Sequence, residues 1–141
     1  MHAEARVIID EAPAVSRQRM LMSVVVLDDA GGRGSVGRSD GRRFWQRGKA
    51  FASLNLRQTT EVLGDLAKTP PDRYFGIMSM YPGKVYLVGG GVPLVVDDRL
   101  VGAVGIAGLP QGVDERAARA GMAAWDKYRA SRRQTPTRRY C

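Results

Sequence analysis

A series of short apolar segments separated by glycines and aspartates constrains the fold of this chain more than any other feature. The segments are residues 85–88, 92–96 and 100–106, and the separators are the glycines at 89–91 and the pair Asp97 and Asp98. Valine and leucine are frequent in the segments, and β-branched side chains suit a buried, pleated surface. Glycine and aspartate suit tight turns, so the series predicts three core strands with short connections, which favours antiparallel pairing.

A hairpin and several helices are predicted around this series. Residues 23–27 contain three consecutive valines and predict a strand, DDAGG (28–32) predicts a turn, and residues 33–38 predict a glycine-weakened second strand. Apolar residues three and four apart predict helices over residues 3–18, with a kink or early end at Pro13, and over 44–56, 60–67 and 113–128. Residues 74–81 fit either a short strand or a 3₁₀ segment. Helices segregated from antiparallel strands indicate the α+β class.

The basic residues of the chain are concentrated at its end. A length of 141 residues fits a single domain, which we assign to residues 1–128, followed by a basic tail at 129–141. The net charge is +8, and six of the 22 basic residues but no acidic residue follow Asp126. The chain up to and including Asp126 therefore has 16 basic and 14 acidic residues. A nearly balanced domain argues against nucleic acid as the partner, and the tail fits a solvated end better than a phosphate-binding arm.

Cysteine and hydropathy set expectations for the compartment. The single cysteine, Cys141, excludes an intramolecular disulfide, which fits a reducing cytoplasm. No apolar run approaches the roughly 20 residues of a membrane span, and the acidic start does not resemble a signal peptide. We therefore expect a cytoplasmic protein without a membrane partner.

Several common catalytic designs lack their residues. The only histidine is His2, near an end, so a Ser–His–Asp triad and a histidine- or cysteine-based metal site are not expected. The glycines at 89–91 and 102–108 match neither the dinucleotide-binding nor the P-loop pattern. They fit tight strand packing, or alternatively a backbone that a ligand approaches closely. Asp28, Asp29, Asp97 and Asp98 fit turns better than a carboxylate pair.

A cluster of polar residues in the middle of the chain carries the remaining chemical potential. It comprises Arg38, Asp40, Arg42, Arg43, Arg47, Lys49, Tyr81 and Tyr86. A guanidinium suits a carboxylate or phosphate, and a desolvated lysine can act as a base or an amine nucleophile. The cluster predicts a small anionic ligand, and a solvated basic face is the alternative.

Five segments together resemble the GlcG/HbpS-like haem-binding family, whose domain also occurs at the C-terminus of a class of corrinoid adenosyltransferase. They are VVVLDDAGG (24–32), RSDG (38–41), GKA (48–50), GGGVPLVVDDRLVGAVGIAG (89–108) and DERAARAGMAAW (114–125). The resemblance implies one antiparallel sheet of about five strands with helices on both faces, and a homo-oligomer. It also implies haem as a possible cofactor and places at the ligand pocket Arg38, Asp40, Lys49, Gly90, Gly91, Val92 and Pro93.

Three functions follow as hypotheses. The first is a small-molecule-binding protein with an anionic or haem-like ligand held by these residues and Tyr81. The second is a cofactor-independent isomerase, lyase or hydrolase acting on a carboxylated intermediate, in which Lys49 or Asp40 moves protons and Arg38 holds the carboxylate. The third is a structural assembly module.

Overall fold

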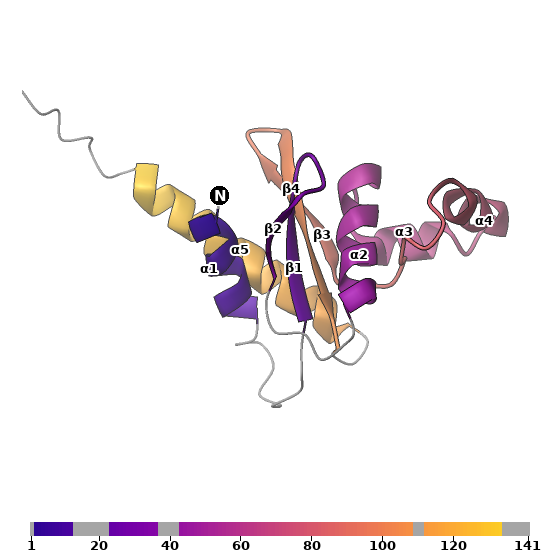
Figure 1. Ribbon diagram of the computed structural model, residues 1–141, viewed down its shortest axis with the longest axis horizontal. Coiled ribbons are helices and arrows are strands. Elements are labelled where there is room, and N and C mark those ends of the chain that lie inside the picture. The colour runs from indigo at the N-terminus through magenta and orange to yellow at the C-terminus, as the bar shows by residue number, and fades with distance from the viewer. Residues whose placement is uncertain (1, 13–22, 37–42, 109–111, 134–141) are drawn as a thin grey trace, which may run out of the picture.

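The computed structural model describes residues 2–12, 23–36, 43–108 and 112–133 (Figure 1). Four strands and five helices alternate irregularly along the described chain, as an α+β fold. In order they are α1 (His2–Glu11), β1 (Ser23–Asp28), β2 (Arg33–Val36), α2 (Arg43–Leu56), α3 (Thr60–Leu66), α4 (Pro71–Met80), β3 (Gly91–Val96), β4 (Arg99–Ala107) and α5 (Val113–Arg133). No helix among the described residues is long and apolar enough to cross a membrane.

The strands form one antiparallel sheet in the order β2-β1-β4-β3. Within the described residues the sheet therefore has four strands, and the expectation of about five is wrong. The segment expected as a strand at 85–88 has no regular secondary structure and does not pair with the sheet. The backbone N–H of Tyr86 donates instead to the carbonyl oxygen of Gly48 in α2 (3.3 Å), because the segment packs along that helix.

Helices cover both faces of the sheet, as Figure 1 shows. Side chains alternate between faces along a strand, and in β4 Val104 and Ile106 contact the core beneath α1 and α5 whereas Ala103 contacts the core beneath α2. Trp125 of α5 is buried in the first of these cores. The sheet is thus the central layer of three.

A glycine of β4 allows α2 to approach the sheet closely. A Cβ added to Gly105 would overlap the carbonyl oxygen of Gln46 and would lie 2.8 Å from the backbone nitrogen of Ala50. The backbones of α2 and β4 therefore meet directly, without side chains between them. This contact fixes the position of Lys49, which lies one residue before Ala50.

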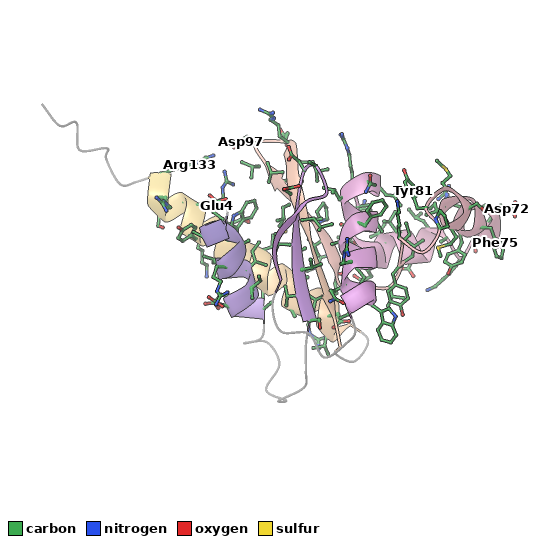
Figure 2. The ribbon with its side chains drawn as sticks, viewed as in Figure 1. Glu4, Asp72, Phe75, Tyr81, Asp97 and Arg133 are labelled. Carbon is green, nitrogen blue, oxygen red and sulfur yellow. The ribbon has the colours of Figure 1, made fainter. Side chains whose placement is uncertain are left out.

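A third apolar core joins α3 and α4 to α2. Its buried members are Ala52, Leu63, Ala67, Val85 and Leu87, from α2, α3 and the segment that follows α4. The strand or 3₁₀ segment expected over 74–81 is wrong, because residues 74–80 belong to α4 and Tyr81 is its C-cap. The helix has Pro71 at its first position and no buried residue. The helix lies at one end of the molecule, where Figure 2 labels Asp72 and Phe75.

The predicted turns are present. The Asp28 carboxylate accepts hydrogen bonds from the backbone N–H groups of Ala30 (3.1 Å) and Gly32 (2.6 Å), which closes the first hairpin. Asp97 and Asp98 have φ values of 48° and 60° and turn the chain between β3 and β4.

The first helix is described in part, and the last one ends later than expected. The first helix is described to Glu11, with Ala12 in a 3₁₀ turn, and residues 13–18, where a kink or early end at Pro13 was expected, lie outside the described residues. The last helix continues five residues past the predicted end at 128, and its terminal Arg133 pairs with Asp97 (3.0 Å). Figure 2 labels this pair. Residues 134–141 of the expected tail lie outside the described residues.

Candidate functional site

A cavity of about 580 Å³ lies between α2, α3, the segment at 86–89 and the region around the start of α5. Its size falls within the usual range of small-molecule sites. The side chains at its base come from two places far apart in the sequence, Lys49 in α2 and the pair Asp114 and Glu115 in the first turn of α5.

Lys49 is buried at this base and paired with a carboxylate. Only 2% of its side chain is exposed, and its Nζ donates to Asp114 Oδ2 (2.7 Å) and to the carbonyl oxygen of Ile106 (2.8 Å). Burial lowers the pKa of Lys49 below its ordinary value, and the hydrogen bond to Asp114 and the charges of Asp114 and Glu115 oppose that shift. The side chain is therefore an amine whose charged form is less favoured than in water.

Gly90 lies directly over the lysine amine. It has a φ of 118°, and a Cβ added there would lie 2.8 Å from Asp114 Cβ and 3.1 Å from Lys49 Nζ. Its N–H donates to Glu115 Oε2 (2.9 Å), and its carbonyl oxygen accepts from the N–H of Ile106 (2.9 Å). Glycine is required here because other residues rarely adopt this backbone conformation and because a side chain would not fit in the space.

The hydroxyl of Thr60 ties the glycine segment to α3. It donates to the carbonyl oxygen of Val88 (2.7 Å) and accepts from the N–H of Gly91 (2.8 Å). These two bonds span the glycine turn, so the wall of the cavity at residues 88–91 is held by a buried side chain.

Two stacked aromatic rings form another wall. The rings of Trp45 and Tyr86 are 5.9 Å apart and inclined by 19°. Lys49 Nζ lies 5.9 Å from the centre of the Tyr86 ring, and the Trp45 side chain is 49% exposed. An aromatic surface of this kind suits the carbon skeleton of a ligand.

The described lining carries more carboxylates than amines. Lys68 at the rim pairs with Asp65 (2.7 Å), and Arg119 of α5 forms an ion pair with Glu115 Oε1 (2.9 Å) that lacks hydrogen-bond geometry. Glu61 also faces the cavity. Within the described ranges, no group of three or more histidine, cysteine or acidic side chains is arranged to hold a metal ion.

The structure brings together part of the predicted site. Lys49, Gly90 and Gly91 meet at the base of the cavity. Val92 lies in the core on the opposite side of the sheet. Tyr81, labelled in Figure 2, packs edge-on against Phe51 (5.4 Å between ring centres) and is not part of the cavity lining.

The remaining predicted residues lie either outside the cavity lining or outside the described residues. Pro93 is half-buried on β3 and is not part of the cavity lining. Arg38, Asp40 and Arg42 lie outside the described residues, and so do the side chains of Arg43 and its neighbour. The ligand-binding roles of all these residues stay predictions.

Sequence reasoning missed the partners of the lysine. Asp114 and Glu115 are typical of a helix N-terminus, where a carboxylate favours the helix dipole, and that explanation needs no burial. Both are nonetheless buried, with 7% and 4% exposure. Charged residues at such low exposure are rare unless paired, but burial is a tertiary property that local spacing does not reveal.

Comparison with known proteins identifies relatives of the whole domain. The family model described as haem degrading protein HbpS-like matches residues 1–123. An uncharacterized 15.0 kDa protein from the dhaT-dhaS intergenic region of Citrobacter freundii is 32% identical over 60 residues, which are 43% of this chain and 42% of that protein. The aligned stretch thus spans less than half of that curated relative.

Solved structures share the fold over most of their length. The protein ORFY of Klebsiella pneumoniae superimposes with a TM-score of 0.80 at 19% identity, over 89% of this chain and 90% of that one. A double mutant of HbpS from Streptomyces reticuli gives 0.73 at 27% identity, over 87% and 84%. A complex of PduOC with heme gives 0.77 at 24% identity, over 86% and 91%.

Proposed function

Because the chain belongs to the HbpS-like family, we propose that it is a small-molecule-binding protein whose ligand occupies the cavity above Lys49. The observation that carries this proposal is the base of the cavity, where a buried amine, a buried carboxylate pair and the backbone of Gly90 converge. A few polar groups fixed within a partly apolar pocket are the usual composition of a ligand site.

Haem is the ligand that the family description and the PduOC complex name, and the described lining does not fit it. Proteins hold haem iron with histidine, cysteine, methionine or tyrosine. Among the described residues that line the cavity, only Tyr86 is of these types, and its ring is stacked on Trp45. The carboxylates of the lining would also repel the haem propionates. We therefore propose a ligand smaller than haem.

The charge of the lining also bears on the expected anionic ligand. Lys49 and Lys68 are each paired with a carboxylate at 2.7 Å. An anion would have to compete with these partners, and the carboxylate of Glu61 also lines the cavity. The described lining thus favours an uncharged polar ligand. An anionic ligand would need Arg38 as the residue that binds its charge.

A homo-oligomer is part of the proposal. The helix α4 carries exposed apolar side chains, among them Phe75 (65%) and Met80 (73%). Exposed apolar area of this kind is typical of surfaces that contact another protein, which agrees with the assembly implied by the resemblance. We also propose a cytoplasmic location, because the single cysteine, Cys141, fits a reducing compartment.

The binding proposal is tested with a variant that fills the cavity. Gly89 lines it, and an added Cβ would meet only Glu61 and Glu115 at ordinary contact distances of 3.7–3.8 Å. Gly89→Leu therefore places a side chain in the cavity without a backbone clash. Gly76→Leu is the matched control, because nothing lies within 4 Å of a Cβ at that position in α4.

The measurement is the thermal unfolding midpoint with hemin, glycolate or propanal present. Since a ligand that binds only the folded state stabilises it, we expect propanal to raise the midpoint in the wild type and in Gly76→Leu but not in Gly89→Leu. The proposal fails if none of the three probes raises the midpoint, or if the rise survives in Gly89→Leu. A Soret band that titrates to one haem per chain and disappears in Gly89→Leu would overturn the proposal that the ligand is smaller than haem.

A further inference from the structure

The amine of Lys49 has a donor to spare at the base of the cavity. An ammonium group has three N–H donors. Two of them meet Asp114 Oδ2 (2.7 Å) and the carbonyl oxygen of Ile106 (2.8 Å). For the third, the described part of the chain supplies no hydrogen-bond acceptor, and Lys49 is a lining residue of the cavity. A polar atom of a ligand is the partner that this position accommodates.

A buried lysine is also a chemically unusual choice for a structural role. An ion pair taken out of water is rarely more stabilising than apolar residues of the same volume. The side chains of Lys49 and Asp114 are 2% and 9% exposed, and both line a cavity of about 580 Å³. Burial lowers the pKa of the lysine, which increases the fraction present as the nucleophilic free amine.

We propose that Lys49 is a nucleophile that forms a Schiff base with an uncharged aldehyde or ketone held in the cavity. The inference rests on the proposed small-molecule function and specifies the chemical class of the ligand. It depends on the contact between Nζ and Asp114 Oδ2 and on the open side of Nζ.

The reaction balances with the groups present. Asp114 accepts a proton from the Lys49 ammonium, and the nitrogen lone pair forms a bond to the carbonyl carbon while the C=O π electrons move to the oxygen. The oxygen then takes up the proton that the attacking nitrogen releases, which gives a neutral carbinolamine. Asp114 then returns a proton to the hydroxyl, the C–O bond breaks, and water leaves. The ammonium and the carbonyl compound thus become a protonated imine and one water, with no oxidant or reductant and no change in net charge.

The surroundings suit this product. The protonated imine keeps its positive charge where the ammonium was, so Asp114 and Glu115 stabilise reactant and product alike. Trp45 and Tyr86 provide an apolar wall for the carbon chain. The carboxylates of Glu61 and Asp65 at the cavity disfavour a carbonyl compound that itself carries a carboxylate.

The test is reductive trapping on the wild-type protein. The protein is incubated near neutral pH with propanal and cyanoborohydride, sampled over time, and digested for peptide mapping by mass spectrometry. Reduction converts the imine to a stable N-propyl lysine. We expect Lys49 to be labelled at least tenfold faster than Lys84 or Lys127, although both of those side chains are exposed and Lys49 is buried. Exposed lysines near neutral pH are almost fully protonated and react slowly.

Variants and a second probe complete the experiment. Lys49→Arg keeps the positive charge opposite Asp114 but has no amine, and it should lose the fast label; Lys84→Arg should retain it. Pyruvate should label Lys49 more slowly than propanal. Labelling of the exposed lysines while Lys49 stays unmodified in the wild type would overturn the inference whether or not the variants fold. If glycolate or hemin still raises the unfolding midpoint in that case, the binding proposal survives; if no probe does, both fail.

Discussion

The Nζ of Lys49 lies 2.7 Å from Oδ2 of Asp114, and only 2% and 9% of the two side chains are exposed. The two residues are separated by 65 positions in the chain. They meet because α2 packs directly on β4 and because α5 begins at the end of the same sheet. This pair therefore bears on both the stability of the fold and the reactivity of the Lys49 amine.

Breaking the pair on one side should be costly. Lys49→Met leaves a carboxylate buried, and we expect the free energy of unfolding to fall by about 3–5 kcal/mol, the usual cost for a buried pair. The double variant with Asp114→Asn should cost less than the sum of the two single changes, because it leaves no unpaired charge. Urea denaturation measures each value. Lys68→Met is the control, since the Lys68–Asp65 pair is exposed, and its effect should stay within about 1 kcal/mol. Additive single changes would contradict the coupling.

The lowered pKa of Lys49 has a defined consequence for stability. Its ordinary value is 10.5, and burial places the folded value below that. Between the two values the unfolded chain binds more protons than the folded one, so the contribution of Lys49 to the free energy of unfolding rises with pH. Below that window the full desolvation cost of the ammonium is present. The difference between wild type and Lys49→Met should therefore grow as the pH rises toward 10.5. A difference between wild type and Lys49→Met that does not change with pH would refute the lowered pKa.

The contact between α2 and β4 predicts a strong effect of one methyl group. In Gly105→Ala the new Cβ would overlap the Gln46 carbonyl oxygen, so we expect a loss of about 1–3 kcal/mol or more. Gly76 lies in the middle of α4, and nothing lies within 4 Å of a Cβ added there. Gly76→Ala should therefore stabilise the folded protein by up to about 1 kcal/mol, because alanine is the better helix former. Thermal unfolding compares the two variants. Equal effects at both positions would mean that α2 does not approach β4 this closely.

Assembly is tested by light scattering at micromolar concentration. We expect a species larger than the 15.4 kDa chain. The proposed reason is apolar contact through surfaces such as the exposed side chains of α4. A monodisperse monomer would contradict the oligomer.

The end of the chain should contribute little to folding. Deletion of residues 134–141 should leave the unfolding midpoint and the propanal-induced rise unchanged. A deletion from residue 130 also removes the Arg133–Asp97 pair, whose side chains are 63% and 74% exposed. Exposed pairs contribute about 1 kcal/mol or less, so this shorter chain should still fold. Loss of a soluble fold after either deletion would show that the domain extends beyond its assigned end.

The sequence by itself determined the features that depend on local chemistry. Side-chain pattern and turn propensity predicted the apolar segments of β3 and β4, the Asp97–Asp98 turn and a helix over residues 44–56, which the structure has at 43–56. The α+β class follows from their order. The family resemblance, carried by phrases such as GGGVPLVV, agrees with the family match over residues 1–123.

Only the tertiary structure decided which of these segments join the sheet and which residues make the site. Residues 85–88 have the composition of a strand, but α2 takes up their backbone N–H at Tyr86 and the sheet ends at β3. Asp114 and Glu115 have the local pattern of a helix start, and their burial against Lys49 and Gly90 arises from the approach of α5 to α2. Burial and long-range pairing depend on where distant segments pack, and the spacing of residues along a chain carries no measure of that.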